Sequence, residues 1–186
     1  MSAVAKKPEE AFSIELTRMR RRHLRKVLAI EARVYPRPWS ASLFLSELAQ
    51  RNSRSYLVAR HAGEVVGYAG MMFTRREAHV TNIAVGPEHQ GHKIGTRLLL
   101  ALITEAIARA SDTISLEVRV TNDAAQNMYE KFGFSIEGVR KGYYVETNED
   151  AYVMVVGDAM STDYRLRLQS IRNDVIRSYP NDTTES

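Results

Sequence analysis

The stretch from residue 81 to residue 100 constrains the fold more than any other part of the chain. A short apolar segment (83–85) reads as a buried strand, and a glycine–proline turn and a loop containing Gly91 follow it. A strongly apolar helix is expected to begin near Gly95 or Thr96. Glycines at a helix N-terminus let backbone N–H groups approach an anion, and the helix dipole favours negative charge there. The stretch therefore predicts a phosphate-binding turn, although the same pattern also occurs as plain structure.

Length and composition narrow the class of protein. The 186 residues suffice for one well-buried core, and 44% hydrophobic with 26% charged residues is typical of a soluble globular protein. No apolar run approaches the roughly 20 residues that cross a bilayer. The charged N-terminus does not resemble a signal peptide. Because the chain has no cysteine, disulfides and thiolate chemistry are excluded, and we expect a cytoplasmic protein without membrane contact.

The charge suits an anionic ligand but does not by itself indicate nucleic acid. The net charge is +4, and the densest basic run lies within residues 18–26. We interpret this run as the solvated face of a helix, with contact to RNA or a ribosome as the alternative. We expect no direct nucleic-acid binding and a monomer or weak dimer. The five histidines show no ligand spacing, which predicts no metal site.

Hydrophobic periodicity predicts alternating strands and helices. Strands are expected over residues 12–19, 55–61, 64–74, 78–85, 114–120, 134–144 and 151–156. Helices are expected from Arg20 to the prolines after Tyr35, after a cap at Ser40, near Gly95, and from Thr121 or Asn122 to Phe132.

The two ends of the chain follow other patterns. Residues 1–11 are predicted to be disordered, and residues 12–160 form the main domain. In the segment 161–186, apolar residues spaced by four, three and four predict an amphipathic helix that ends before Pro180: Tyr164, Leu168, Ile171 and Val175. We expect this helix to cap the domain, with a dimer contact as the alternative, and a frayed polar tail to follow it.

The glycine loop does not fit the commonest phosphate motifs. It lacks the third glycine of the Rossmann fingerprint, and no Walker Gly-Lys-Ser/Thr tripeptide occurs. It resembles instead the coenzyme A pyrophosphate loop of the GNAT acetyltransferases, Q/R-x-x-G-x-G/A, as Gln90-Gly91-His92-Lys93-Ile94-Gly95. Downstream, Asn122-x-x-Ala125-x-x-x-Tyr129-x-x-x-Gly133-Phe134 matches a second segment of that family.

This resemblance implies a fold and a donor. The fold would be an α/β (α+β) domain whose mixed sheet of about seven strands is flanked by four helices, with the C-terminal helix added. The donor would be acetyl-CoA, held by Ile83, Ala84, Val85, Gln90, Gly91, His92, Lys93, Ile94, Gly95, Thr96 and Asn122. Lys93 departs from the family, because it replaces the first loop glycine. If the backbone at this position has a positive φ, lysine costs about 1 kcal/mol or more there. If lysine can adopt the conformation freely, its cation lies beside the pyrophosphate.

The resemblance also implies that Glu117 is the general base and Tyr129 the general acid. A base needs a pKa raised from about 4.3 towards neutrality, which partial burial of Glu117 would supply, and it is expected to act through a water. Without the resemblance, Glu117 could equally be a surface carboxylate. Tyr129 could be a core aromatic, but as a phenol with a pKa near 10 it can donate a proton at neutral pH.

Further segments resemble the family members that acetylate the N-terminal alanine of a ribosomal protein. These are Pro38-Trp39-Ser40, Asn82–Val85, Leu116–Arg119, Arg140–Tyr144 and Glu149–Ala151. The acceptor would be the N-terminal peptide of such a protein, in a groove formed by Tyr35, Trp39, Arg140, Tyr143 and Tyr144. Acetylation of lysine side chains or small amines is an alternative. A non-catalytic acetyl-CoA-binding module is another.

Overall fold

The computed structural model describes residues 12–184, so the disorder predicted for residues 1–11 lies outside it. The strands are β1 (Glu15–Arg18), β2 (Arg54–His61), β3 (Glu64–Phe73), β4 (Glu77–Val85), β5 (Thr113–Arg119), β6 (Ser135–Tyr144), β7 (Glu149–Val156) and β8 (Thr183–Thr184). The helices are α1 (Leu24–Val34), α2 (Ala41–Ala49), α3 (Ile94–Ala108), α4 (Asp123–Lys131) and α5 (Thr162–Ser178).

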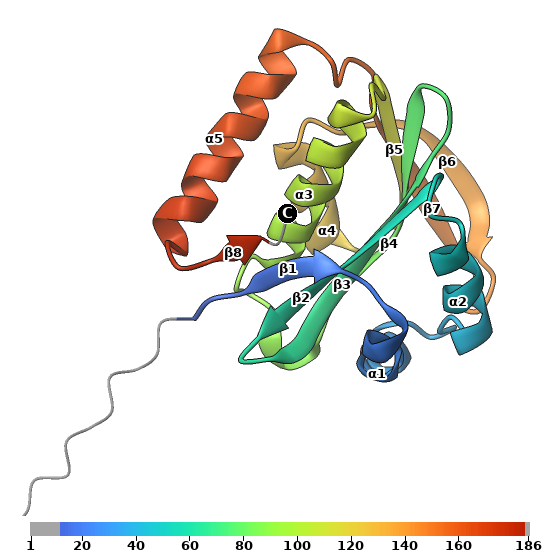
Figure 1. Cartoon of the computed structure of the whole chain (residues 1–186). Helices are drawn as coiled ribbons and strands as arrows, with labels where there is room; N and C mark the ends of the chain where they lie inside the picture. The colour runs from blue at the N-terminus through green and yellow to red at the C-terminus, as the bar shows by residue number, and fades with distance from the viewer. Residues whose placement is uncertain (1–11, 185–186) are drawn as a thin grey trace, which may run out of the picture.

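The strands form one mixed sheet in the order β6-β7-β5-β4-β3-β2-β1-β8 (Figure 1). The predicted mixed sheet, its seven main strands and the five helices are confirmed. Local capping was also read correctly from the sequence. The Ser40 hydroxyl accepts a hydrogen bond from the Leu43 N–H at 3.2 Å, and the Asn122 side-chain oxygen accepts one from the Ala125 N–H at 3.1 Å.

Helices cover both faces of the sheet, each over its own apolar core. On one face, α1 and α2 bury Val27 and Phe44 against Tyr68 of β3. On the other face, α3 buries an almost continuous apolar surface, which α4 and α5 extend. Figure 1 shows α5 lying beside α3, on the side of the sheet away from α1. None of the helices within residues 12–184 has both the length and the hydrophobicity needed to span a membrane.

The C-terminal helix caps the domain as predicted, but the fraying predicted for the tail is wrong for residues 179–184, the part that the structure describes. Tyr164 and Leu168 of α5 are buried in the core beside α3. After α5 the chain turns back, and β8 extends the sheet by pairing in parallel with β1, Thr183 opposite Glu15. The polar composition of the tail suggested fraying because its partners lie far away in the sequence.

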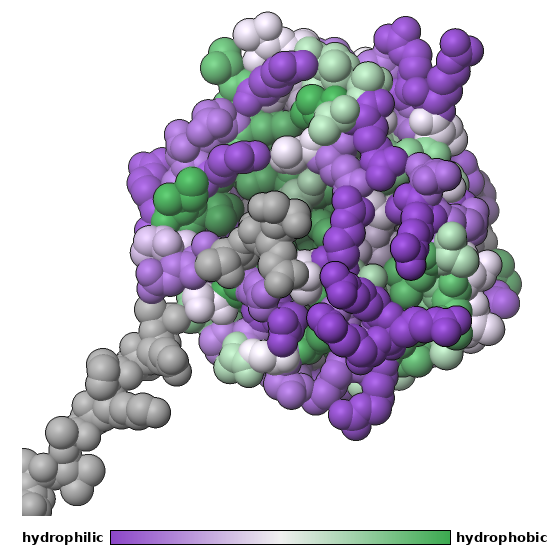
Figure 2. All heavy atoms as spheres, in the orientation of Figure 1, coloured by the Kyte–Doolittle hydropathy of each residue, from purple (hydrophilic) through white to green (hydrophobic). Residues whose placement is uncertain are grey.

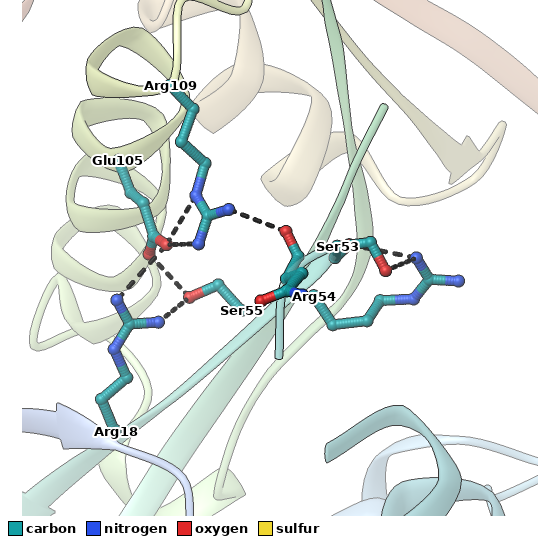
Figure 3. A network of polar contacts seen from close by, with 7 residues as sticks. Arg18, Ser53, Arg54, Ser55, Glu105 and Arg109 are labelled. Atoms are coloured by element: carbon teal, nitrogen blue, oxygen red, sulfur yellow. Dashed lines mark hydrogen bonds and ion pairs between the residues drawn. The ribbon is translucent and has the colours of Figure 1, made fainter. Parts of the chain in front are cut away.

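The basic run 18–26 begins where β1 leads into α1. Its arginines are exposed, as both a solvated helix face and a contact with RNA require, and hydrophilic side chains gather over this part of the surface in Figure 2. Arg18 also has a structural role, because it donates to the Ser55 hydroxyl at 2.8 Å and lies 3.3 Å from the Glu105 carboxylate (Figure 3). Arg109 also binds Glu105, at 2.8 Å. This network joins β1 and β2 to α3.

Candidate active site

A gap in the middle of the sheet creates the main cavity. β4 and β5 pair in parallel only where Glu77–His79 face Thr113–Ser115. Immediately beyond, the register of β4 on β3 shifts, because Gly70 faces Asn82 while Met71 faces Val80. Thr81 is the extra residue of this β-bulge, and bulges bend a strand locally. The remainder of β4 therefore leaves β5, and a cavity of about 790 Å³ opens along the separated strands.

Most of the predicted site residues line this cavity. They are Tyr35, Trp39, Ile83, Ala84, Val85, Gln90, Gly91, Lys93, Ile94, Gly95, Thr96, Glu117, Asn122, Tyr129, Tyr143 and Tyr144. Two do not line it. The His92 ring instead stacks on Phe12 with ring centroids 4.0 Å apart. Arg140 reaches the site indirectly, with its guanidinium 3.3 Å from the Glu117 carboxylate.

The glycine loop has the geometry of an anion site. α3 begins at Ile94, so the N–H groups of its first turn have no acceptor within the helix and point towards the loop. Gly91 has φ +83° and Lys93 has φ +54°, so two loop residues are left-handed. For a lysine this conformation costs about 1 kcal/mol. The Lys93 ammonium donates to the Ser178 hydroxyl on α5 at 3.1 Å, which holds the cation at the outer side of the loop.

Glu117 is half-buried in the cavity wall, and its neighbours favour the anion. His79, its neighbour on β4, places Nε2 2.9 Å from one carboxylate oxygen, and the other His79 nitrogen lies 2.9 Å from the Ser115 hydroxyl. The hydrogen bond from His79 lowers the pKa of Glu117 below 4.5, and the nearby charges of His79 and Arg140 add to this effect against the opposing effect of burial. The raised pKa expected from the sequence is therefore wrong.

Glu31, which the sequence reasoning missed, is a second carboxylate in the cavity wall. It is buried on α1, and one of its oxygens accepts the Trp39 N–H at 2.9 Å. The other oxygen has no hydrogen-bond partner among the described residues. Burial raises the pKa of Glu31 to about 7. A signal was present in the sequence, because Glu31 falls seven residues after Leu24 on the apolar stripe of its helix.

The raised pKa of Glu31 predicts that the free energy of unfolding depends on pH. Its pKa is about 7 in the folded protein against 4.5 normally, so ionisation opposes folding. Wild-type stability should fall relative to Glu31→Gln as the pH rises from 4.5 through 7, by about 3 kcal/mol in total. Urea unfolding at pH 4.5 and pH 8 measures this difference. The exposed Glu137→Gln is the control, and a Glu31→Gln difference that does not change with pH would contradict the raised pKa.

Tyr129 lies at the end of α4 with its ring in the core and its hydroxyl at the cavity. The ring packs edge-on against Phe134 with centroids 5.9 Å apart. No residue within 12–184 forms a hydrogen bond with the hydroxyl, although the residue is only 5% exposed. Burial raises the pKa of Tyr129 well above its ordinary value, so the phenol stays protonated. A protonated, unpaired phenol in a cavity can donate to a leaving group.

Aromatic side chains form the opposite wall of the cavity. The Tyr35 hydroxyl donates to the Ile83 carbonyl at 2.7 Å, which ties α1 to β4. Tyr143 and Tyr144 pack edge to face with ring centroids 5.1 Å apart, and the Arg119 guanidinium lies 3.8 Å from the centre of the Tyr144 ring. Tyr143 is 43% exposed, so this wall opens to solvent where a peptide could enter.

Comparison with known proteins agrees with this geometry. A model described as "Acetyltransferase (GNAT) family" matches residues 24–134, which include the loop, Glu117 and Tyr129. The chain belongs to the GNAT acetyltransferase family. GNAT enzymes use acetyl-CoA, and the predicted fold class is thereby confirmed.

Several relatives within the GNAT family carry more specific names. The Escherichia coli (strain K12) ribosomal protein bS18-alanine N-acetyltransferase is 36% identical over 133 residues, 70% of this chain and 88% of that protein. The N-alpha-acetyltransferase RimI of Mycobacterium tuberculosis is 40% identical over 121 residues, 63% of this chain and 74% of that protein. A crystal structure of the Escherichia coli ribosomal-protein-S18-alanine N-acetyltransferase aligns with TM-score 0.73 and 31% identity, covering 81% of this chain and 97% of that chain.

Proposed function

We propose that this protein transfers the acetyl group of acetyl-CoA to the N-terminal α-amine of a peptide, with the alanine at the start of a ribosomal protein as its acceptor. The observation that carries the proposal is the juxtaposition of an anion loop, an unpaired strand edge, a carboxylate and a protonated tyrosine around one cavity. The names of the GNAT relatives support the choice of acceptor.

The residues present fit acetyl-CoA. The free N–H groups at the start of α3 would bind the pyrophosphate, and Gly91 lets the backbone approach closely because it has no side chain. The separated part of β4, residues 83–85, offers its backbone groups to the pantetheine as another strand would. One of these N–H groups would also stabilise the oxyanion. Asn122 contributes mainly by fixing α4, because its side-chain oxygen caps that helix.

The acid–base groups suit an α-amine. An α-amine with a pKa of about 7.7–8.0 is roughly a tenth neutral at pH 7, whereas a lysine amine near 10.4 is less than a thousandth neutral. Anionic Glu117 attracts and orients the incoming ammonium, and it accepts the proton through a water. Glu31, with a pKa of about 7, is a second acceptor in the same cavity wall. Tyr129 donates its proton to the departing thiolate.

The acceptor assay tests the proposal directly. The purified protein is incubated with acetyl-CoA and a peptide that carries the N-terminal sequence of the ribosomal protein, beginning with alanine. Two matched reactions use other acceptors. One is the same peptide with a blocked N-terminus and an internal lysine, and the other is spermidine. We expect kcat/KM for the free α-amine to exceed both others by at least about 100-fold, following the fraction of neutral amine. Comparable rates on the blocked peptide or on spermidine would overturn the acceptor class, and binding of CoA without turnover would indicate a non-catalytic module.

A further inference from the structure

Arg97 is a buried cation on α3, whose other buried residues are all apolar, and it faces the C-terminal segment rather than the cavity. One of its guanidinium nitrogens donates to the backbone carbonyl of His92, within the glycine loop, at 2.6 Å. Another forms an ion pair with Asp182. The ring of Tyr179 covers the guanidinium at 4.1 Å from its centroid. A single buried arginine thus connects the loop to two residues that follow α5.

Other contacts hold the same two segments together. Lys93 of the loop donates to Ser178 at the end of α5, as described above. Asp182 is itself held in place, because it accepts the Ile14 N–H at 2.8 Å. The backbone of β8 then pairs with β1, directly after Asp182. The C-terminal segment is therefore fixed to the sheet, so its contacts can hold the glycine loop in place.

We propose that residues 178–182 form a brace that holds the glycine loop in its anion-binding conformation, with Arg97 as the positioning residue. The loop needs such support, because Lys93 occupies a left-handed conformation that a lysine adopts at a cost. The His92 carbonyl accepts its hydrogen bond from Arg97, and neither residue lines the cavity. The brace and a bound pyrophosphate therefore do not compete for the same groups of the loop. The inference rests on the proposed function only in that this loop binds coenzyme A.

The brace should affect donor affinity and leave the chemical step alone. None of the contacts of Arg97, Tyr179 or Asp182 involves Glu117, Glu31 or Tyr129.

Two variants and one control test the brace in the full-length protein. Asp182→Asn removes the charge opposite Arg97. Arg97→Met combined with Asp182→Ala removes both partners and leaves no unpaired charge in the core, which protects the fold. Asp174→Asn breaks an exposed ion pair with Arg177 on α5 and serves as the control. The measurements are the Kd for CoA by calorimetry, KM and kcat for acetyl-CoA, and amide hydrogen exchange of residues 90–96 without ligand.

We expect both brace variants to raise the Kd for CoA and the KM for acetyl-CoA about tenfold, the factor that corresponds to one charged hydrogen bond. We expect kcat to stay within about twofold, and exchange in the loop to accelerate in the free protein. Unchanged affinity and exchange in the folded double variant would overturn the brace, as would a fall in kcat without a change in KM. Because exchange is measured without donor or acceptor, a wrong acceptor would overturn the proposed function while leaving this inference standing.

Discussion

Glu117→Gln is expected to lower kcat by about 100-fold or more, with the Kd for CoA unchanged within about twofold. Glutamine keeps the shape of the side chain but can neither accept the amine's proton nor attract its ammonium form. His79 and Arg140 also lose the anion that they contact at 2.9 and 3.3 Å. Steady-state kinetics with the alanine-starting peptide and calorimetry with CoA measure the two effects separately.

The control for this substitution is Glu77→Gln, which lies on β4 at the exposed end of the strand that carries His79. Melting temperatures of both variants show whether Glu117→Gln is folded. A folded Glu117→Gln enzyme that keeps wild-type kcat would remove Glu117 from the mechanism. A large rise in the Kd for CoA would instead assign Glu117 to donor binding.

The pH dependence distinguishes the two carboxylates. Because the pKa of Glu117 lies below 4.5, Glu117 stays ionised throughout the range in which the enzyme is expected to work. Glu31, whose pKa is about 7, and the acceptor amine both titrate in the range where a limb of kcat/KM near pH 7 would arise. Glu31→Gln removes the first contribution and leaves the second, so a profile that is unchanged in Glu31→Gln excludes Glu31 as the base.

The parts of the fold that depend on local chemistry were predictable from the sequence. Ser40 was predicted as a cap, and the next such position was narrowed to Thr121 or Asn122; in the structure the side chains of Ser40 and Asn122 accept hydrogen bonds from the following turn. The helix that Asn122 caps was predicted to end at Phe132, and the structure gives the next residue, Gly133, a φ of +87°, which a glycine adopts readily after a helix. The spacing between the loop and Tyr129 indicated that both belong to one site. The residues assigned to that site line the cavity, except His92 and Arg140.

The parts that depend on partners distant in the sequence were not predictable. The pKa of Glu117 is set by His79, which meets it only because β4 and β5 pair at His79 and Ser115. The C-terminal segment is held in place because Asp182 forms an ion pair with Arg97, which lies 85 residues earlier in the chain. A charged residue inside the apolar run of α3 was nonetheless a usable signal. A buried arginine must have an anion, although the sequence does not say which one.

Tyr129→Phe is expected to lower kcat by about 100-fold, again with little change in the Kd for CoA. Phenylalanine keeps the ring, which packs against Phe134 at 5.9 Å, so the core is preserved while the proton donor is lost. The deficit should become smaller above about pH 8.5, because a thiolate leaving group needs protonation less as the pH passes the pKa of a thiol. Kinetics from pH 6.5 to pH 9.5 test both statements.

Tyr164→Phe is the matched control for Tyr129→Phe. Both tyrosines are 5% exposed, and burial raises the pKa of each, but Tyr164 lies on α5 against the core and not in the cavity wall. Removing a buried hydroxyl should therefore affect turnover at Tyr129 alone. If both variants lose activity equally, the loss reflects core packing. If neither loses activity, solvent or another group protonates the thiolate, and the role of Tyr129 reduces to that of a core aromatic.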